Sequence, residues 1–230
     1  MEHPQRQPAT QEAQPMARES FPKPESITKE TLLLVEGNDS RNFFEAMRDH
    51  LSLSHQLQII NFGGIKQLKN TLLGLRGASG FTDIKSIGII RDAETNPTGA
   101  FQSVQASLRR AKLPIPANPE QLSCDGQPAV GVLILPGQGK PGMLETLLCK
   151  TFADAPECRC IDVFFKCVEE LRQGRTAKRP DKARAQAFIA TQPDPHVSVG
   201  VAARKRYWNL DHQALAPVRD FLKSVAAAAN

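Results

Sequence analysis

The chain has 230 residues, which is enough for one domain of ordinary size and a short appendage. Hydrophobic residues make up 40% of it and charged residues 23%, the balance of a soluble globular protein, and the absence of a long apolar run excludes a membrane span and predicts a cytoplasmic protein. The formal net charge of +5 permits binding to nucleic acid, whereas the 6% of aromatic residues argue against a base-stacking surface.

Residues 1–28 are rich in Pro, Gln and Glu and show no hydrophobic period, so we predict a disordered tail. Four short apolar runs follow, and each precedes a segment whose apolar residues recur at helical spacing. The predicted strands are Leu32–Val35, Leu57–Ile60, Ile84–Ile90 and Val130–Leu135, and the predicted helices are 43–51, 68–75, 101–111 and 143–148. This alternation predicts an α/β core over residues 29–154, with a mostly parallel four-stranded sheet flanked by helices.

Residues 155–230 are predicted to form a mainly helical C-terminal extension packed on this core. Its helical segments are 161–171, 182–190 and 214–229. Pro141 is expected in the first turn of the predicted helix at 143–148, a position that a proline fits well. The cysteines of this half lack paired C-x-x-C spacing, which favours buried or inert thiols over a zinc site.

Acidic residues follow three of the four predicted strands. Glu36 and Asp39 follow the first strand, Asp92 and Glu94 the third, and Glu145 comes shortly after the fourth. Ligands bind at the carboxyl ends of strands in open parallel sheets, so we expect these side chains to share one edge. Clustered carboxylates call for a cation, and an oxygen-only set suits Mg²⁺ or Mn²⁺. The alternative is that they are solvated or cap helices, for which Asn38 and Asp39 are the best candidates.

Two of these strand ends resemble the motifs of the Toprim family. They are Leu-Leu-Val-Glu-Gly-Asn-Asp at 33–39 and Ile-Gly-Ile-Ile-Arg-Asp-Ala-Glu at 87–94, and Gly63-Gly64 also fits. The sequence is similar to small stand-alone bacterial Toprim-like proteins of unknown function, on segments 135–145 and 207–211, and to the Toprim domain of OLD-family nucleases. The resemblance covers about residues 31–222 and implies a Rossmann-like Toprim fold.

The resemblance also implies roles for the acids. Glu36 would be a metal ligand or general acid/base, Asp92 and Glu94 metal ligands at the catalytic centre, and Asp39 and Glu145 additional metal contacts. The family pattern has Asp where this chain has Glu94, whose side chain is one methylene longer. A neighbouring ATPase or other protein partner and a homo-oligomer are both left open.

Basic residues are frequent in the C-terminal half and could contact a phosphate backbone. The candidates for nucleic-acid contact are Lys140, Lys182, Arg204, Lys205 and Arg206. An ordinary solvated surface is the alternative. The glycines 137, 139 and 142 formally match a dinucleotide-binding fingerprint. They follow the fourth strand instead of the first, however, and Pro141 removes a backbone N–H from the turn, so a nucleotide cofactor is disfavoured.

The favoured hypothesis is a Mg²⁺- or Mn²⁺-dependent phosphoryl-transfer enzyme, a nuclease acting on DNA or RNA. The alternative is a non-catalytic Toprim-like module that binds nucleic acid or a partner protein. An enzyme acting on a small phosphorylated substrate is a third hypothesis.

Overall fold

The structure is a computed structural model that describes residues 26–123 and 125–229. Its strands are β1 (Thr31–Val35), β2 (Leu57–Asn61), β3 (Ser86–Asp92) and β4 (Ala129–Leu135). Its α-helices are α1 (Gly37–His50), α2 (Ile65–Arg76), α3 (Pro97–Arg110), α4 (Leu144–Thr151), α5 (Pro156–Leu171), α6 (Pro180–Ala190), α7 (Val199–Arg204) and α8 (Ala216–Ala227). Two short 3₁₀ helices are η1 (Phe81–Asp83) and η2 (Gln213–Leu215).

The four strands form one sheet in the order β2-β1-β3-β4, and every pair is parallel. The predicted α/β fold, with a parallel sheet flanked by helices, is therefore confirmed. Val35 at the end of β1 lies opposite Ile90, while β3 continues to Asp92 opposite Leu135. The carboxyl ends of β1 and β3 therefore lie side by side at the centre of the sheet.

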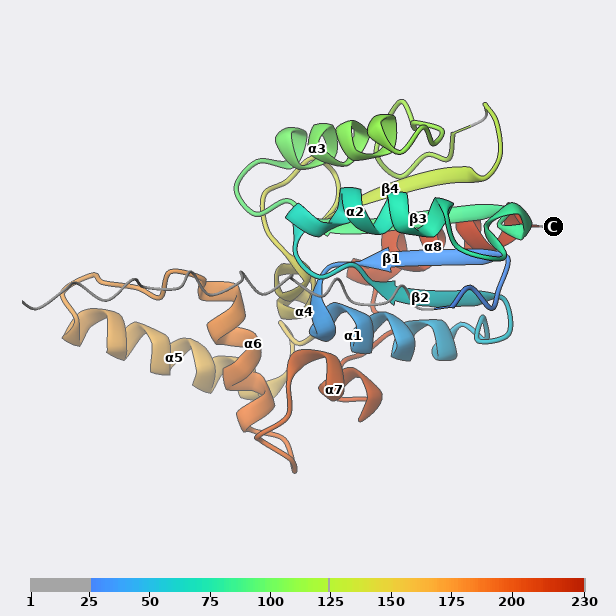
Figure 1. Cartoon of the computed structure of the whole chain (residues 1–230). Helices are drawn as coiled ribbons and strands as arrows, with labels where there is room; N and C mark the ends of the chain where they lie inside the picture. Colours follow the sequence, from blue (N-terminus) through green and yellow to red (C-terminus); the bar gives the residue numbers. More distant parts are fainter. Residues whose placement is uncertain (1–25, 124, 230) are drawn as a thin grey trace, which may run out of the picture.

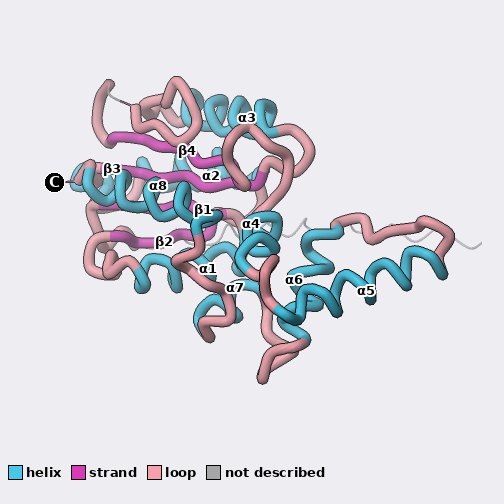
Figure 2. The backbone as a smooth tube through the Cα atoms, turned by 180° about the vertical axis from the view of Figure 1, so that it is seen from behind, coloured by secondary structure: helices cyan, strands magenta, loops and turns pink. Residues whose placement is uncertain are grey.

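Alternate side chains of each strand enter two different cores, because successive residues point to opposite faces. Leu32 and Leu34 join the cluster that includes apolar residues of α2 and α3. Leu33 and Val35 join the cluster that includes residues of α1, α4 and α8. The sheet is thus buried on both faces, which explains why its strands read as continuous apolar runs (Figures 1 and 2).

Helix α8 approaches the sheet closely at two strand glycines. A Cβ atom at Gly88 would come within 2.9 Å of Leu33 Cδ1 and 3.3 Å of Phe221 Cε1. A Cβ atom at Gly131 would come within 3.0 Å of the same Phe221 ring. These two positions leave room for the ring of Phe221, and so they set how deeply the last helix lies on the sheet.

The C-terminal half both covers the sheet and projects from it. Helices α5 and α6 extend away from the sheet as an arm, which is seen in both ribbon views (Figures 1 and 2). Phe188 of α6 stacks on Phe152, with 4.2 Å between the ring centroids, and Trp208 contacts both rings. The base of the arm is therefore anchored by aromatic packing in the same core as α1 and α8.

Several boundaries differ from the prediction. Helix α4 begins at Leu144, so Pro141 precedes the helix and the expectation that it lies in the first turn is wrong. The cause is a short antiparallel bridge between Gly142 and Glu94, which holds the preceding chain extended. Helix α5 begins at Pro156, five residues earlier than expected, and α7 was not predicted.

Most of the predicted tail, residues 1–25, lies outside the described residues. Of the remaining three residues, Ile27 packs against the core, and the Thr28 N–H donates to Gln58 Oε1 at 2.8 Å. Among the helices that the structure describes, none combines the length and apolar character needed to cross a membrane.

Candidate metal centre

Glu36 lies at the junction of β1 and α1, beside the start of α2. Its Oε1 accepts a hydrogen bond of 3.2 Å from the backbone N–H of Ile65, the first residue of α2. The same residue occupies the N-cap position of α1, although its side chain makes no cap bond. The Glu36 carboxylate therefore lies near the N-terminal ends of two helices.

Asn61 ties this junction together and was missed by the sequence analysis. Its Oδ1 accepts hydrogen bonds from the N–H groups of Gly37 and Gly63, both at 2.8 Å, and its Nδ2 donates to Asn38 Oδ1. One side chain at the end of β2 thus fixes the loops after β1 and β2. A single amide at a strand end has no distinctive pattern in sequence, so no signal could have singled it out.

Asp92 is the last residue of β3, and among the acids of this region its carboxyl has the most strongly shifted pKa. Its Oδ1 accepts a hydrogen bond from the Leu144 N–H at 3.0 Å. Burial raises the pKa of Asp92 to about 7, and the charges of Glu145, Glu36 and Glu94 act in the same direction. Asp92 is thus within electrostatic reach of three of the acids that the sequence predicted at this edge.

Glu94 is positioned by the loop that follows β4. Its backbone exchanges two hydrogen bonds with Gly142, of 2.8 and 2.7 Å. Its carboxylate forms an ion pair with Arg179, 3.2 Å away, just before α6. The loop that contains Gly142 is therefore bonded to the backbone of Glu94, whose carboxylate pairs with Arg179 at the start of the arm helix α6.

Glu145 lies in the first turn of α4 and is only 7% exposed. Its Oε1 is 3.6 Å from Lys182 Nζ in the first turn of α6. Asp181 fixes that turn, because its carboxylate accepts a 2.6 Å hydrogen bond from Thr146 Oγ1 on α4. Arg179 was part of the basic run in the sequence, but nothing there indicated its pairing with Glu94.

Asp39 lies in the first turn of α1 and is partly exposed. Because the N-cap of α1 is Glu36, the expectation that Asn38 or Asp39 caps this helix is wrong. Helix α7 packs closely here, since a Cβ atom at Gly200 would come within 2.2 Å of the Asp39 carbonyl oxygen. Asp39 therefore lies on the side of the site that faces α7.

The donor set fits a hard divalent cation by its chemistry, because it consists of carboxylates near a partly buried aspartate. Glu36, Asp92, Glu94 and Glu145 are the residues that could hold such an ion. Within residues 26–123 and 125–229, however, no group of three or more His, Cys, Asp or Glu side chains has the arrangement needed to hold a metal ion. Arg179 and Lys182 instead supply positive charge to two of the four acids.

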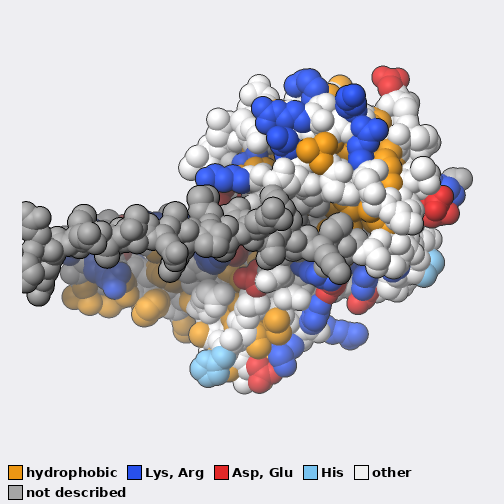
Figure 3. Space-filling view, in the orientation of Figure 1, with side chains coloured by type: hydrophobic (Ala, Val, Ile, Leu, Met, Phe, Trp, Pro, Cys, Tyr) orange, Lys and Arg blue, Asp and Glu red, His pale blue; other side chains and the backbone are white. Residues whose placement is uncertain are grey.

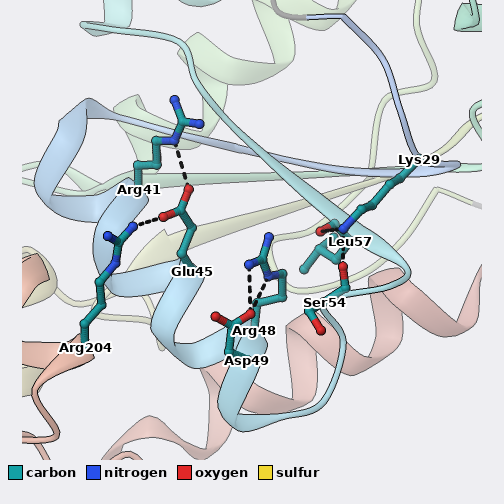
Figure 4. A network of polar contacts seen from close by, with 8 residues as sticks. All are labelled: Lys29, Arg41, Glu45, Arg48, Asp49, Ser54, Leu57 and Arg204. Atoms are coloured by element: carbon teal, nitrogen blue, oxygen red, sulfur yellow. Dashed lines mark hydrogen bonds and ion pairs between the residues drawn. The ribbon is translucent and has the colours of Figure 1, made fainter.

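The residues predicted to contact nucleic acid occupy two different places. Lys182 lies beside Glu145, and Lys140 is exposed in the loop after β4. Arg204 instead pairs with Glu45 of α1, which Arg41 also contacts (Figure 4). Lys205 pairs with Asp194 at 2.6 Å, and Arg206 lines a hollow beside α1 with His50 and Trp208. The segment 204–206 thus lies along α1, and two of its three charges are already paired with acids.

The four cysteines that the structure describes form no disulfide. Burial raises the pKa of the Cys149 thiol to about 12, and the nearby Asp181 charge adds to this effect. A thiol with so high a pKa is rarely a thiolate, the form that attacks or binds metals. Cys149, Cys158, Cys160 and Cys167 are free.

Comparisons with known proteins add a family and a weak structural likeness. A family model described as "Protein of unknown function (DUF3226)" matches residues 30–227. A structure of the C-terminal region of the Xanthomonas campestris pv. campestris OLD protein, phased with iodine, is 15% identical, with a TM-score of 0.41 over 87% of this chain and 96% of that one. A second structure of that region, phased with mercury, is 13% identical, with a TM-score of 0.35 over 88% and 89% of the two chains. Among curated proteins no match was found.

Proposed function

The chain belongs to the DUF3226 family of proteins of unknown function, and we propose that it is a Mg²⁺- or Mn²⁺-dependent phosphoryl-transfer enzyme, a nuclease acting on DNA or RNA. One observation carries the proposal. Asp92 is partly buried at the carboxyl end of β3, one of the two central strands, and the charges of Glu36, Glu94 and Glu145 all raise its pKa. Such a cluster is costly unless its charge serves to bind a cation.

In this proposal four carboxylates of the cluster hold the cation, and Asp39 adds a contact from the first turn of α1. When bound, the ion would polarise a phosphate group and orient the attacking water. Glu36, which accepts a hydrogen bond from the Ile65 N–H, would either hold the ion or act as the general acid or base. Lys182, which pairs with Glu145 in the structure, would stabilise the negative charge of the transferred phosphoryl group.

The test is nicking of supercoiled plasmid and cleavage of single-stranded DNA and RNA with Mg²⁺ or Mn²⁺. We expect activity in the unchanged chain and its loss in Glu36→Gln and Asp92→Asn. Asp83→Asn is the matched control, because Asp83 is exposed and precedes β3 at the opposite end of the strands. Equal cleavage by the unchanged chain and by both site variants would contradict the proposal, since the activity would then come from elsewhere or from a contaminant.

A non-catalytic binding module is the second candidate, and a specific observation favours it. Arg179 and Lys182 already neutralise Glu94 and Glu145, which is how a purely structural acidic cluster would be arranged. Thermal melting with and without Mg²⁺ measures whether the metal binds the folded chain. A salt titration of DNA binding measures phosphate contacts. Stabilisation by metal together with salt-dependent binding, but without turnover of DNA or RNA, would decide for this candidate.

A further inference from the structure

Helix α5 has two apolar faces, and only one of them packs against other residues that the structure describes. The inner face consists of the buried Cys158 and Ile161, with Phe165 and Val168 partly buried. The outer face consists of exposed residues: Cys160, Val163, Phe164, Cys167 and Leu171. On this outer face Val163 is 64% exposed, Phe164 57% and Leu171 80%. Large apolar side chains this exposed along one helix mark an interaction surface.

The outer face has the spacing of a coiled-coil seam. Cys160, Phe164, Cys167 and Leu171 follow one another at intervals of four, three and four residues, the a/d repeat over which two helices interlock. These residues span about 17 Å of helix at 1.5 Å per residue. The arm holds α5 away from the sheet, and its apolar side chains line the lower edge of the projecting part (Figures 1 and 3).

The charges on α5 indicate which partner the outer face takes. The helix carries four acidic residues and only two basic ones, Arg159 and Lys166. A helix that lies on a membrane or on nucleic acid is expected to be rich in Lys and Arg instead. An apolar seam on a net acidic helix fits another protein helix, and the α5 helix of a second copy has the same seam.

The arrangement of the flanking charges favours antiparallel pairing. Arg159 near the start of α5 and Glu170 near its end project from the same flank of the seam, by helical periodicity. In an antiparallel pair that matches Cys160 with Leu171 of the other copy, Arg159 comes beside Glu170 of the other copy, and the two-fold axis produces this contact twice. We propose that α5 is the contact of a symmetric antiparallel homodimer of this chain.

Sedimentation or light scattering over a range of concentrations tests the proposal. A seam of this length is at the small end of specific interfaces, so we expect a concentration-dependent dimer. Phe164→Glu and Leu171→Glu should each give a monomer that melts like the unchanged chain, because neither side chain packs in the core. Leu73→Glu is the matched control, since Leu73 is an exposed leucine, 44% exposed, on α2, and this variant should still dimerise.

Charge reversal tests the orientation of the pair. Arg159→Glu should weaken the dimer by roughly threefold for each of the two symmetric pairs, and adding Glu170→Arg should restore it. A short bismaleimide gives an independent readout. Antiparallel helices place Cys160 near Cys167 of the other copy, so the unchanged chain forms a covalent dimer, whereas Cys167→Ser, which keeps Cys160, forms less.

Four outcomes would overturn the proposal. The first is a chain that stays monomeric at every concentration, including one whose α5 instead binds lipid vesicles, and the second is a dimer that survives both glutamate substitutions. The third is a Leu73→Glu variant that also loses the dimer. The fourth is efficient cross-linking of the Cys167→Ser variant through paired Cys160 residues, which would indicate parallel helices.

Discussion

At the scale of single residues, Asp92 connects the fold with the proposed chemistry. Its backbone completes the central strand, and its carboxylate accepts the first N–H of α4. This position partly buries the carboxylate and exposes it to the charges of Glu36, Glu94 and Glu145, which makes its ionisation costly. The raised pKa on which the proposed cation site rests therefore also predicts that the stability of the metal-free chain depends on pH.

The pH dependence follows from the raised pKa of Asp92. In the unfolded chain this carboxyl ionises near its ordinary value of 3.8, and in the folded chain at about 7. Between these values the folded chain holds a proton that the unfolded chain has lost, so the free energy of unfolding falls as pH rises. We expect the metal-free chain to lose on the order of 3 kcal/mol from about pH 4 to pH 8 through this group.

Asp92→Asn removes the ionisable group and should flatten this dependence, making the variant more stable than the unchanged chain at pH 8 without metal. The amide oxygen can still accept from the Leu144 N–H, and its NH₂ can donate to the neighbouring carboxylates. Thermal melts with chelator from pH 5 to pH 8 check it, with Asp83→Asn as the control. Parallel pH profiles for Asp92→Asn and the unchanged chain would show that Asp92 titrates normally.

At the scale of elements, two contacts position the site. The start of α6 is fixed on α4 through Thr146 and Asp181, which brings Arg179 and Lys182 to the acids. On the same face of the sheet, α8 lies against β3 and β4, where Gly88 and Gly131 leave space for Phe221. The contact of α6 with α4 brings basic side chains to the acids of the site. The contact of α8 with the sheet supports β3, the strand that ends in Asp92.

Gly88→Ala should destabilise the chain by about 1–3 kcal/mol, because the new Cβ meets Leu33 and Phe221 and overpacks the core. Gly74→Ala is the matched control. A Cβ at Gly74, in the exposed part of α2, meets no atom within 4 Å, so alanine should stabilise the helix by up to about 1 kcal/mol. Urea unfolding measures both changes. A neutral Gly88→Ala would mean that α8 can shift away from the sheet without cost.

At the scale of the whole molecule, the two halves of the chain share one core. The cluster that contains Leu33 and Val35 of β1 also contains Phe188, Trp208 and Phe221 from the C-terminal half. Trp208 is 2% exposed, and its Nε1 donates to the Val199 carbonyl oxygen at 2.9 Å. The base of the arm is therefore built into the same core as the sheet.

We expect the C-terminal half and the sheet to unfold together. Trp208 is the chain's single tryptophan, so its fluorescence reports on the C-terminal half, while far-UV circular dichroism reports on all helices and strands. In a urea titration the two signals should share one midpoint, as for a two-state domain. Fluorescence that changes at clearly lower urea than the circular dichroism would show that the C-terminal half unfolds separately.

The sequence by itself determined the strands, the helices that follow them and the acids at the strand ends. Hydrophobic periodicity reflects which side chains are buried, and the ends of parallel strands share one edge. It predicted Pro141 in the wrong place and missed Asn61, because both depend on partners distant in the chain. Only the tertiary structure decided the order β2-β1-β3-β4, the pairing of Glu94 with Arg179 and of Glu145 with Lys182, and the exposed outer face of α5. Glu94 and Arg179 are 85 residues apart, and local pattern does not encode which distant charges a folded chain brings together.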